Sequence, residues 1–276
     1  ALLGPNGSGK TTLLQILTGL RKAHSRHVRL LGTDVSALTL AQRQSIGYIA
    51  EGQSLPDRMR LAELEAYLMP LYPRWDRALA ARLRARFELD PRQRLGAMSR
   101  GQRMKAALLC ALAPRPRLLL MDEPFTGMDA QVKDDLVRGL LDTSGDEGWT
   151  VLLCSHDIGE LEMLADWVAF LQHGSMRTAL PMDELRSRFR RVDVLLSGDA
   201  VGSDPTPGEW MSVERSGPRL SFVLDHRDSV PAEVALRAAF PGSARIDVRD
   251  ATLREVFVAL AKHRPSERAR LEEVTS

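Results

Sequence analysis

Residues 4–11, Gly-Pro-Asn-Gly-Ser-Gly-Lys-Thr, are of types and at a spacing that could bind phosphate. They match the pattern G-x-x-x-x-G-K-[ST] at every fixed position, and they lie between the apolar residues 1–3 and leucines at helical spacing. Glycines let a backbone curl so that several N–H groups face one anion, and the helix that follows adds its positive N-terminal end. We therefore predict a phosphate-binding P-loop at the start of the chain.

The residue types in this loop have separate predicted tasks. Lys10 would reach the β- and γ-phosphates of a nucleoside triphosphate, and the Thr11 hydroxyl would help to hold Mg²⁺. The alternative is a glycine-rich turn before an ordinary helix, which the strand, the Lys-Thr pair and the helix together disfavour. The residues of this segment predicted to bind nucleotide are Gly4, Pro5, Asn6, Gly7, Ser8, Gly9, Lys10, Thr11 and Thr12.

Two adjacent carboxylates, Asp122 and Glu123, follow the apolar run at residues 118–121. Ligands of an open parallel sheet gather at the carboxyl ends of its strands, so these acids are predicted to lie beside the phosphates. Successive strand residues point to opposite faces, so the two carboxylates can take different tasks. Asp122 would hold Mg²⁺, directly or through water, and Glu123 would polarise the attacking water as general base.

The elements that must position these residues form an α/β pattern. Short apolar runs alternate with helical patterns through the first ~190 residues, which predicts a parallel sheet covered by helices. The candidate strands are residues 28–31, 46–50, 118–121, 151–154 and 168–171, and the candidate helices are residues 61–71, 77–87 and 102–112. We predict a P-loop NTPase core at residues 1–188, with a largely helical insert at about 55–112.

A small α+β appendage is predicted at residues 189–276. Residues 198–217 are rich in Gly, Pro, Ser and Asp, and they are predicted to form a loop. The candidate strands of the appendage are residues 192–196, 220–224 and 244–248, and its candidate helices are residues 231–240 and 252–262. The appendage carries no chemical motif.

Composition argues against several classes of function. Lys+Arg of 38 against Asp+Glu of 36 gives a net charge of +2, which does not favour a nucleic-acid partner. Cys110 and Cys154 lie in apolar contexts and are predicted to be buried thiols of a reducing compartment. No apolar run approaches the ~20 residues that span a bilayer. We therefore expect the chain to meet a membrane only through a partner.

The order of the motifs resembles that of the ATP-binding-cassette (ABC) ATPases. Residues 98–102, Met-Ser-Arg-Gly-Gln, are similar to the family signature Leu-Ser-Gly-Gly-Gln, with Met for Leu and Arg for the first Gly. Residues 125–129, just after the two acids, look like the D-loop of that family, and residues 155–157, Ser-His-Asp, look like its switch histidine. The resemblance covers about residues 1–185.

This resemblance implies a site shared by two subunits. Two nucleotide-binding domains would face each other head to tail, with two ATP molecules between them. Ser99, Gly101 and Gln102 of one subunit would meet the ATP bound by the other, and Asp129 of the D-loop is counted with these nucleotide-binding residues. His156 would contact the γ-phosphate and help to hold Glu123 and the water.

Two departures from the family pattern stand out. Glu51 occupies the place where the family usually has a Gln, and it is either a contact on the Mg²⁺ and water side or an ordinary loop acid. Family members begin with two strands and an adenine-stacking aromatic residue upstream of the P-loop. Only three residues precede Gly4, so we expect this sequence to lack that part of the cassette.

The function implied by the resemblance is that of an ATP hydrolase subunit of a membrane transporter. It would lie in the cytoplasm, on the inner face of the cell membrane, and pass its motion to separate transmembrane permease subunits. Residues 251–257 resemble the tails of exporters, so export is expected. The alternatives are a non-transport ABC protein that acts on ribosomes or DNA and a regulatory module that senses ATP.

Overall fold

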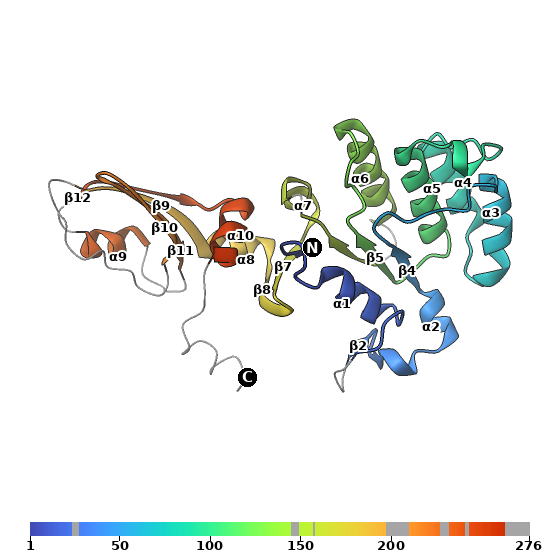
Figure 1. Cartoon of the computed structure of the whole chain (residues 1–276), viewed down its shortest axis with the longest axis horizontal. Helices are drawn as coiled ribbons and strands as arrows, with labels where there is room; N and C mark the ends of the chain where they lie inside the picture. Colours follow the sequence, from blue (N-terminus) through green and yellow to red (C-terminus); the bar gives the residue numbers. More distant parts are fainter. Residues whose placement is uncertain are drawn as a thin grey trace. The chain divides into compact units, whose positions relative to one another are not determined.

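The computed structural model describes residues 1–23, 28–144, 149–156, 158–196, 210–226, 232–240 and 243–262. The chain divides into two compact units (Figure 1). The first unit consists of residues 1–2 and 9–156, and the second consists of residues 3–8 and 157–276. The short strand β1 (Leu2–Leu3) contributes one residue to each unit. The domain border at residue 188 stays a prediction.

A parallel sheet forms the centre of the first unit, in the strand order β4-β5-β6-β1. The strands are β4 (Ile46–Ile49), β5 (Leu118–Asp122) and β6 (Thr150–Cys154). Leu118 lies opposite Ile46 on one side and Thr150 on the other, and Cys154 lies opposite Leu2 of β1. Every residue of β5 is buried, as expected for a continuous apolar strand covered on both faces. The predicted parallel α/β core is confirmed.

Helices flank this sheet and form the predicted insert. The helix α1 packs against β5 and α5 packs against β4, while α3 and α4 both pack against α5 (Figure 1). The α-helices are α1 (Lys10–Leu17), α2 (Leu40–Gln44), α3 (Leu61–Leu68), α4 (Arg77–Arg86), α5 (Arg100–Leu112) and α6 (Ala130–Ser144). The shorter elements are β2 (Arg29–Leu30), β3 (Thr33–Asp34), η1 (Val35–Ala37), η2 (Met69–Leu71) and η3 (Leu95–Ala97).

The second unit contains an antiparallel four-stranded sheet in the order β10-β11-β9-β12. Its strands are β9 (Phe189–Leu196), β10 (Trp210–Ser216), β11 (Arg219–Asp225) and β12 (Ser243–Asp250). The helix α9 (Ala232–Ala239) covers one face of this sheet. Beneath it, the Trp210 ring stacks on Phe222 at a centroid distance of 4.1 Å and on Phe240 at 5.3 Å. The remaining elements are α7 (Ile158–Leu164), β7 (Trp167–Gln172), β8 (Ser175–Pro181), α8 (Met182–Arg188) and α10 (Leu253–Lys262).

The prediction of a loop at residues 198–217 is wrong for its last part, which forms β10. Trp210 and Met211 are buried, but the pairing with β11 shifts register between Met211 and Glu214. This irregularity interrupts the alternation of buried and exposed residues that identifies a strand in a sequence. Residues 197–209 lie outside the described part of the chain.

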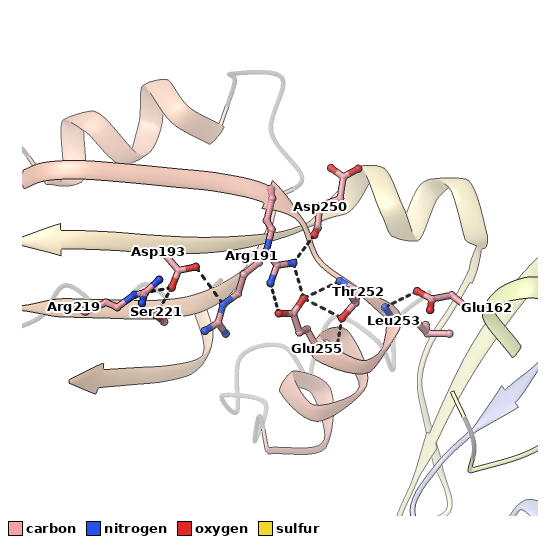
Figure 2. A network of polar contacts seen from close by, with 10 residues as sticks. Glu162, Arg191, Asp193, Arg219, Ser221, Asp250, Thr252, Leu253 and Glu255 are labelled. Atoms are coloured by element: carbon pink, nitrogen blue, oxygen red, sulfur yellow. Dashed lines mark hydrogen bonds and ion pairs between the residues drawn. The ribbon is translucent and has the colours of Figure 1, made fainter. Parts of the chain in front are cut away.

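A network of polar contacts holds the N-terminal end of α10 (Figure 2). The Thr252 N–H donates to Glu255 Oε2 at 2.9 Å, and the Glu255 N–H donates to Thr252 Oγ1 at 3.3 Å, which is a reciprocal capping box. Arg249 donates to both Glu255 oxygens, at 2.9 Å from Nη1 to Oε2 and at 2.5 Å from Nη2 to Oε1. The Leu253 N–H donates to Glu162 Oε1 at 3.2 Å. Each charge in this network therefore has an opposite charge or a helix terminus as its partner.

Candidate nucleotide-binding site

The first unit places the P-loop lysine at the start of a helix. Gly9 caps α1 with φ 107° and ψ 8°, in the left-handed region, where a residue with a Cβ is strained. Lys10 and Thr11 are the first two residues of α1, and the Lys10 side chain is buried, with 7% exposure. The free N–H groups and the dipole at the start of this helix favour an anion, as the P-loop prediction requires.

Residues 4–8 of the loop belong to the second unit. The Ser8 N–H donates to the Pro5 carbonyl at 3.1 Å, so the loop forms a tight turn. The Ser8 hydroxyl is buried, and it has no hydrogen-bonding partner among the residues that the structure describes. Pro5, Asn6 and Gly7 are exposed. The turn therefore buries a hydroxyl of the predicted phosphate loop, that of Ser8, which has no partner in the described part of the chain.

Asp122 is a buried carboxylate at the end of β5. Its exposed fraction is 0%, and neither oxygen has a hydrogen-bonding partner of ordinary geometry within the described ranges. Burial raises the pKa of Asp122, the facing Thr11 hydroxyl lowers it, and the charge of Glu123 raises it further. An unpaired buried acid costs folding free energy, and a cation would remove that cost.

Asp122 and Thr11 offer the oxygen ligands that Mg²⁺ prefers. This ion is usually held by one or two carboxylates together with substrate phosphates, instead of by a cage made only of protein groups. The described residues contain no cluster of three or more His, Cys, Asp or Glu side chains that could hold a metal ion. The unpaired carboxylate and the hydroxyl therefore fit the predicted ion.

Glu123 lies just beyond β5 and connects the other predicted catalytic groups. Its Oε1 is 3.8 Å from Lys10 Nζ, and its Oε2 is 2.7 Å from His156 Nδ1. The His156 backbone N–H also donates to Oε2, at 3.3 Å. The Glu123 side chain is only 8% exposed, whereas that of His156 is 57% exposed. The structure thus brings Lys10, Glu123 and His156 together, and a proton on Nδ1 would make the ring a hydrogen-bond donor to the carboxylate.

The backbone conformation of Glu123, and not strand alternation, sets the direction of its side chain relative to Asp122. The alternation of strand residues was expected to point them to opposite faces, but β5 ends at Asp122. Glu123 has φ 49°, in the left-handed region, and its N–H donates to the Cys154 carbonyl at 2.9 Å. This conformation costs a non-glycine residue about 1–2 kcal/mol. A strained turn, and not the pleat of the strand, aims the predicted base.

The signature residues lie at the N-terminal end of α5. Ser99 caps this helix: its Oγ accepts from the Gln102 N–H at 3.2 Å, and the Ser99 N–H donates to Gln102 Oε1 at 3.0 Å. Gly101 lies so close to Val132 of α6 that a Cβ would be 2.7 Å from Val132 Cγ1. Ser99 is exposed, so the start of α5 is open to a ligand from outside the chain.

The remaining predicted residues have local roles. Asp129 Oδ1 accepts from the Val132 N–H at 2.9 Å, which fixes the start of α6. Glu51 is exposed, in a turn where the side chain of the neighbouring Gln53 accepts from the Ala50 N–H at 3.2 Å. Thr12, in the first turn of α1, is half-buried. The structure does not bring Glu51 into hydrogen-bond contact with Glu123 or His156.

Sequence reasoning missed two residues of the site. Thr126 Oγ1 donates to Glu123 Oε2 at 3.3 Å, and Thr126 lies in the D-loop segment, whose position could have indicated it. Tyr48 of β4 has a raised pKa, caused first by burial and then by the charge of Asp122. No sequence signal marks Tyr48, because its position depends on the pairing of β4 with β5.

Known proteins resemble this chain in sequence and in fold. The family model described as "ABC transporter" matches residues 1–126. The sulfate/thiosulfate import ATP-binding protein CysA of Salmonella typhi is 37% identical over 188 residues, which are 65% of this chain and 51% of that protein. The CysA protein of Burkholderia pseudomallei (strain K96243) is 31% identical over 271 residues, which are 90% of this chain and 77% of that protein. The chain thus spans about half the length of the Salmonella relative.

Solved structures share the fold. An ATP-binding subunit of an ABC transporter aligns with a TM-score of 0.60 and 23% identity, over 67% of this chain and 79% of that chain. The ATP-binding cassette MJ0796, in a dimeric post-hydrolysis state bound to ADP and Pi, aligns with a TM-score of 0.57 and 23% identity, over 66% of this chain and 84% of that chain. Together with the curated relatives, these similarities show that this chain belongs to the ABC transporter family, among its ATP-binding proteins.

Proposed function

We propose that this chain hydrolyses ATP as the energy-supplying subunit of an ABC transporter. One observation carries the proposal. Four side chains meet at the ends of β5 and β6, beside the start of α1. They are the lysine Lys10, the unpaired buried carboxylate Asp122, the strained glutamate Glu123 and the histidine His156 that contacts Glu123. A structural ion-pair network would not leave Asp122 unpaired or hold Glu123 in a left-handed turn.

The chemistry follows from these contacts. The Lys10 ammonium, 3.8 Å from Glu123 Oε1 in this state, would exchange that carboxylate for the β- and γ-phosphates of ATP. Glu123 would then be free to take a proton from the attacking water, while His156 holds its second oxygen and contacts the γ-phosphate. Thr11 and Asp122 would hold Mg²⁺, which neutralises charge on the phosphates when it is bound.

A second copy of the cassette would complete the site. The Ser99 hydroxyl and the first turn of α5 are open at the surface, and Gln102 braces that turn through its contact with Ser99. Ser99, Gly101 and Gln102 would therefore meet an ATP molecule held by the partner, head to tail, with Asp129 shaping the same interface. The dimeric state of the cassette MJ0796, which shares the fold, supports this arrangement. Glu51 would serve as a contact on the Mg²⁺ and water side.

We assign the direction of transport from the relatives, whose names describe import of sulfate or thiosulfate. These names do not support the export expected from residues 251–257. In the structure, that segment caps α10 through Thr252 and Glu255, and its Phe257 ring packs 6.0 Å from the ring of Phe170. Its residue types therefore have a structural explanation that is independent of direction. We therefore propose that the chain drives import through permease subunits. These subunits would hold it at the cytoplasmic face of the membrane.

Among the described residues, no helix combines the length and the apolar character needed to cross a bilayer. The permease partners and the place at the membrane therefore rest on the family, and copurification of the chain with membrane proteins would test them.

The substitution Glu123→Gln tests the catalytic assignment. The amide keeps the shape of the side chain but cannot accept the proton of the attacking water. We expect ATP hydrolysis, measured as phosphate release, to fall at least about 100-fold. ATP affinity should be unchanged, and ATP-dependent dimers should accumulate on a sizing column because the γ-phosphate is no longer removed.

The matched control is Asp134→Asn, which removes an exposed carboxylate of α6 whose one ion-pair partner among the described residues is Arg138, at 3.0 Å. This variant should hydrolyse ATP at the rate of the unaltered chain. Full hydrolysis by the Glu123→Gln variant would remove the assignment of Glu123 as base. A Glu123→Gln variant that stays monomeric at saturating ATP would instead argue against the shared site.

A further inference from the structure

The signature segment and the D-loop of the same chain pack against each other where the sequence departs from the family pattern. Arg100 replaces the first glycine of the signature, and its guanidinium lies on the backbone of Gly127. A Cβ at Gly127 would be 2.5 Å from Arg100 Nη1 and 3.1 Å from Cζ. Gly127 also has φ 71°, a conformation that favours glycine. This contact therefore depends on the absence of a side chain at residue 127.

Two further contacts join the same elements. A Cβ at Gly101 would be 2.7 Å from Val132 Cγ1, so the first turn of α5 lies directly against the first turn of α6. About one turn further along α5, Lys105 Nζ is 3.0 Å from Asp135 Oδ2 of α6. The start of α5, the D-loop and the start of α6 thus form one packed block, and Arg100 is the cation at its exposed end.

The D-loop part of this block is hydrogen-bonded to Glu123, the predicted base. Thr126, the residue before Gly127, donates its hydroxyl to Glu123 Oε2 at 3.3 Å and its N–H to the Glu123 carbonyl at 3.4 Å. The Met128 N–H donates to the Phe125 carbonyl at 3.3 Å, so the turn is closed on both sides of Gly127. A displacement of the Gly127 backbone would therefore move the Thr126 hydroxyl away from the carboxylate.

The placement of Arg100 is not explained by helix stability. A cation in the first turn of a helix opposes the helix dipole, which favours acids there. In the described ranges, Arg100 also has no acidic partner, whereas the neighbouring Arg103 is paired with Asp57. A planar guanidinium is more weakly hydrated than a lysine ammonium, so it can lie against the backbone at a smaller cost in lost hydration. Since neither the helix dipole nor an acidic partner among the described residues accounts for Arg100, we attribute its position to the contact with Gly127.

We propose that Arg100 is a positioning residue for Glu123: its guanidinium holds the Gly127 backbone and so keeps the Thr126 hydroxyl on the carboxylate. The inference rests on the proposed function, in which Glu123 is the base. It extends that function, because Arg100 would connect two parts of the machinery. One is the signature segment, which would bind the ATP held by the partner, and the other is Glu123, the base for the ATP held by the same chain.

The test is a cycle of the Arg100→Ala and Thr126→Ala variants in the full chain. Each single variant should lower kcat for ATP hydrolysis about 10-fold while KM and the affinity for ATP stay unchanged, because the base is misplaced and nucleotide contacts are kept. The double variant should be no slower than Thr126→Ala alone, since both substitutions break one path. Thr126→Ser keeps the hydroxyl and should retain most of the activity.

A second readout does not depend on hydrolysis. The ring ¹⁵N shifts of His156 report whether its Nδ1 proton is held by Glu123, and they should move in both alanine variants. The matched control is Arg103→Ala, which removes a guanidinium of the same helix that is paired with Asp57 instead of the D-loop. In this control, kcat and the His156 shifts should be unchanged.

Three outcomes would overturn the inference. Additive losses in the double variant would show two independent effects, and a fall in ATP affinity equal to the fall in kcat would make Arg100 a nucleotide contact. Unchanged His156 shifts in Arg100→Ala would show that Glu123 does not move. An unaltered chain without any hydrolysis would defeat the proposed function. His156 shifts that differ between that chain and the Arg100→Ala variant would still support the link from Arg100 to Glu123.

Discussion

The strand-end site of the first unit and the polar network of the second unit use similar side chains in opposite ways. In the first unit, Asp122 is buried without a hydrogen-bonding partner of ordinary geometry among the described residues, and Lys10 Nζ lies 3.8 Å from a glutamate oxygen. In the second unit, Glu255 receives two hydrogen bonds from Arg249 and also caps α10 (Figure 2). Satisfied charges stabilise a fold, whereas buried unsatisfied ones indicate a ligand that the protein alone does not supply.

The pKa values of two acids follow the same contrast. Burial raises the pKa of Asp122, whereas the hydrogen bonds from Arg249 lower the pKa of Glu255 to about 2. For Asp122, the folded state holds its proton more tightly than the unfolded state, so stability falls as the pH rises from the ordinary aspartate pKa through the raised one. For Glu255, the stabilisation is present above the ordinary glutamate pKa and is lost as the pH falls toward about 2.

The largest expected effect is that of Asp122→Asn. The neutral amide removes the proposed Mg²⁺ ligand, so ATP hydrolysis should fall by at least about 100-fold. The same change removes a buried charge, so the chain without nucleotide should unfold at a higher urea concentration at neutral pH. This gain should shrink as the pH is lowered, because Asp122 itself becomes protonated. A lower urea midpoint at neutral pH would show that Asp122 stabilises the fold and would break the comparison.

Arg188→Met should have the largest effect on the second unit. Arg188 Nε and Nη2 donate to the two oxygens of Asp225 at 2.5 and 2.8 Å, and both side chains are mostly buried. Loss of this pair should lower the free energy of unfolding by about 2 kcal/mol, because a poorly solvated carboxylate loses its charged donors. Urea unfolding followed by near-ultraviolet circular dichroism of the stacked aromatic residues would measure it.

The matched control is Arg190→Met, because Arg190 pairs with Asp250, whose side chain is 72% exposed. That variant should lose less than about 1 kcal/mol. Equal losses of unfolding free energy in the two variants would show that burial does not determine how much these ion pairs stabilise the fold.

Glu255→Gln should have a smaller effect than Arg188→Met, about 1 kcal/mol, since it weakens a helix cap and a partly exposed ion pair. The difference in unfolding free energy between the variant and the unaltered chain should be largest at neutral pH. It should vanish as the pH falls toward about 2, where Glu255 itself becomes neutral. Urea midpoints measured from neutral to acidic pH would follow it. A difference that stays constant across this range would assign the loss to packing and not to charge.

The sequence was sufficient for the elements that are uniform along their length. The run at residues 118–121 predicted β5, and the motif pattern placed Lys10, Asp122, Glu123 and His156 at strand and helix ends, where the structure has them. These predictions succeed because apolar periodicity and motif spacing are local properties of the chain.

The remaining features depend on contacts between segments that are distant in sequence or on backbone irregularities. The bulge in β10 hides its alternation, the left-handed conformation of Glu123 is fixed by a hydrogen bond to Cys154, and the Arg100 contact requires α5 to lie on the D-loop. None of these features has a signature in single residue types. The places of the site residues on strands and helices were therefore easier to predict than the backbone geometry that orients them.

The burial of Cys154 gives the site an internal reporter. Its side chain has an exposed fraction of 0%, and burial raises the pKa of the thiol to about 12, so the reactive thiolate is almost absent at neutral pH. An alkylating reagent can therefore reach this sulfur only when β6 separates from its neighbours. The rate of its labelling, with and without ATP, would time the opening of the sheet beside the nucleotide without any added dye or tag.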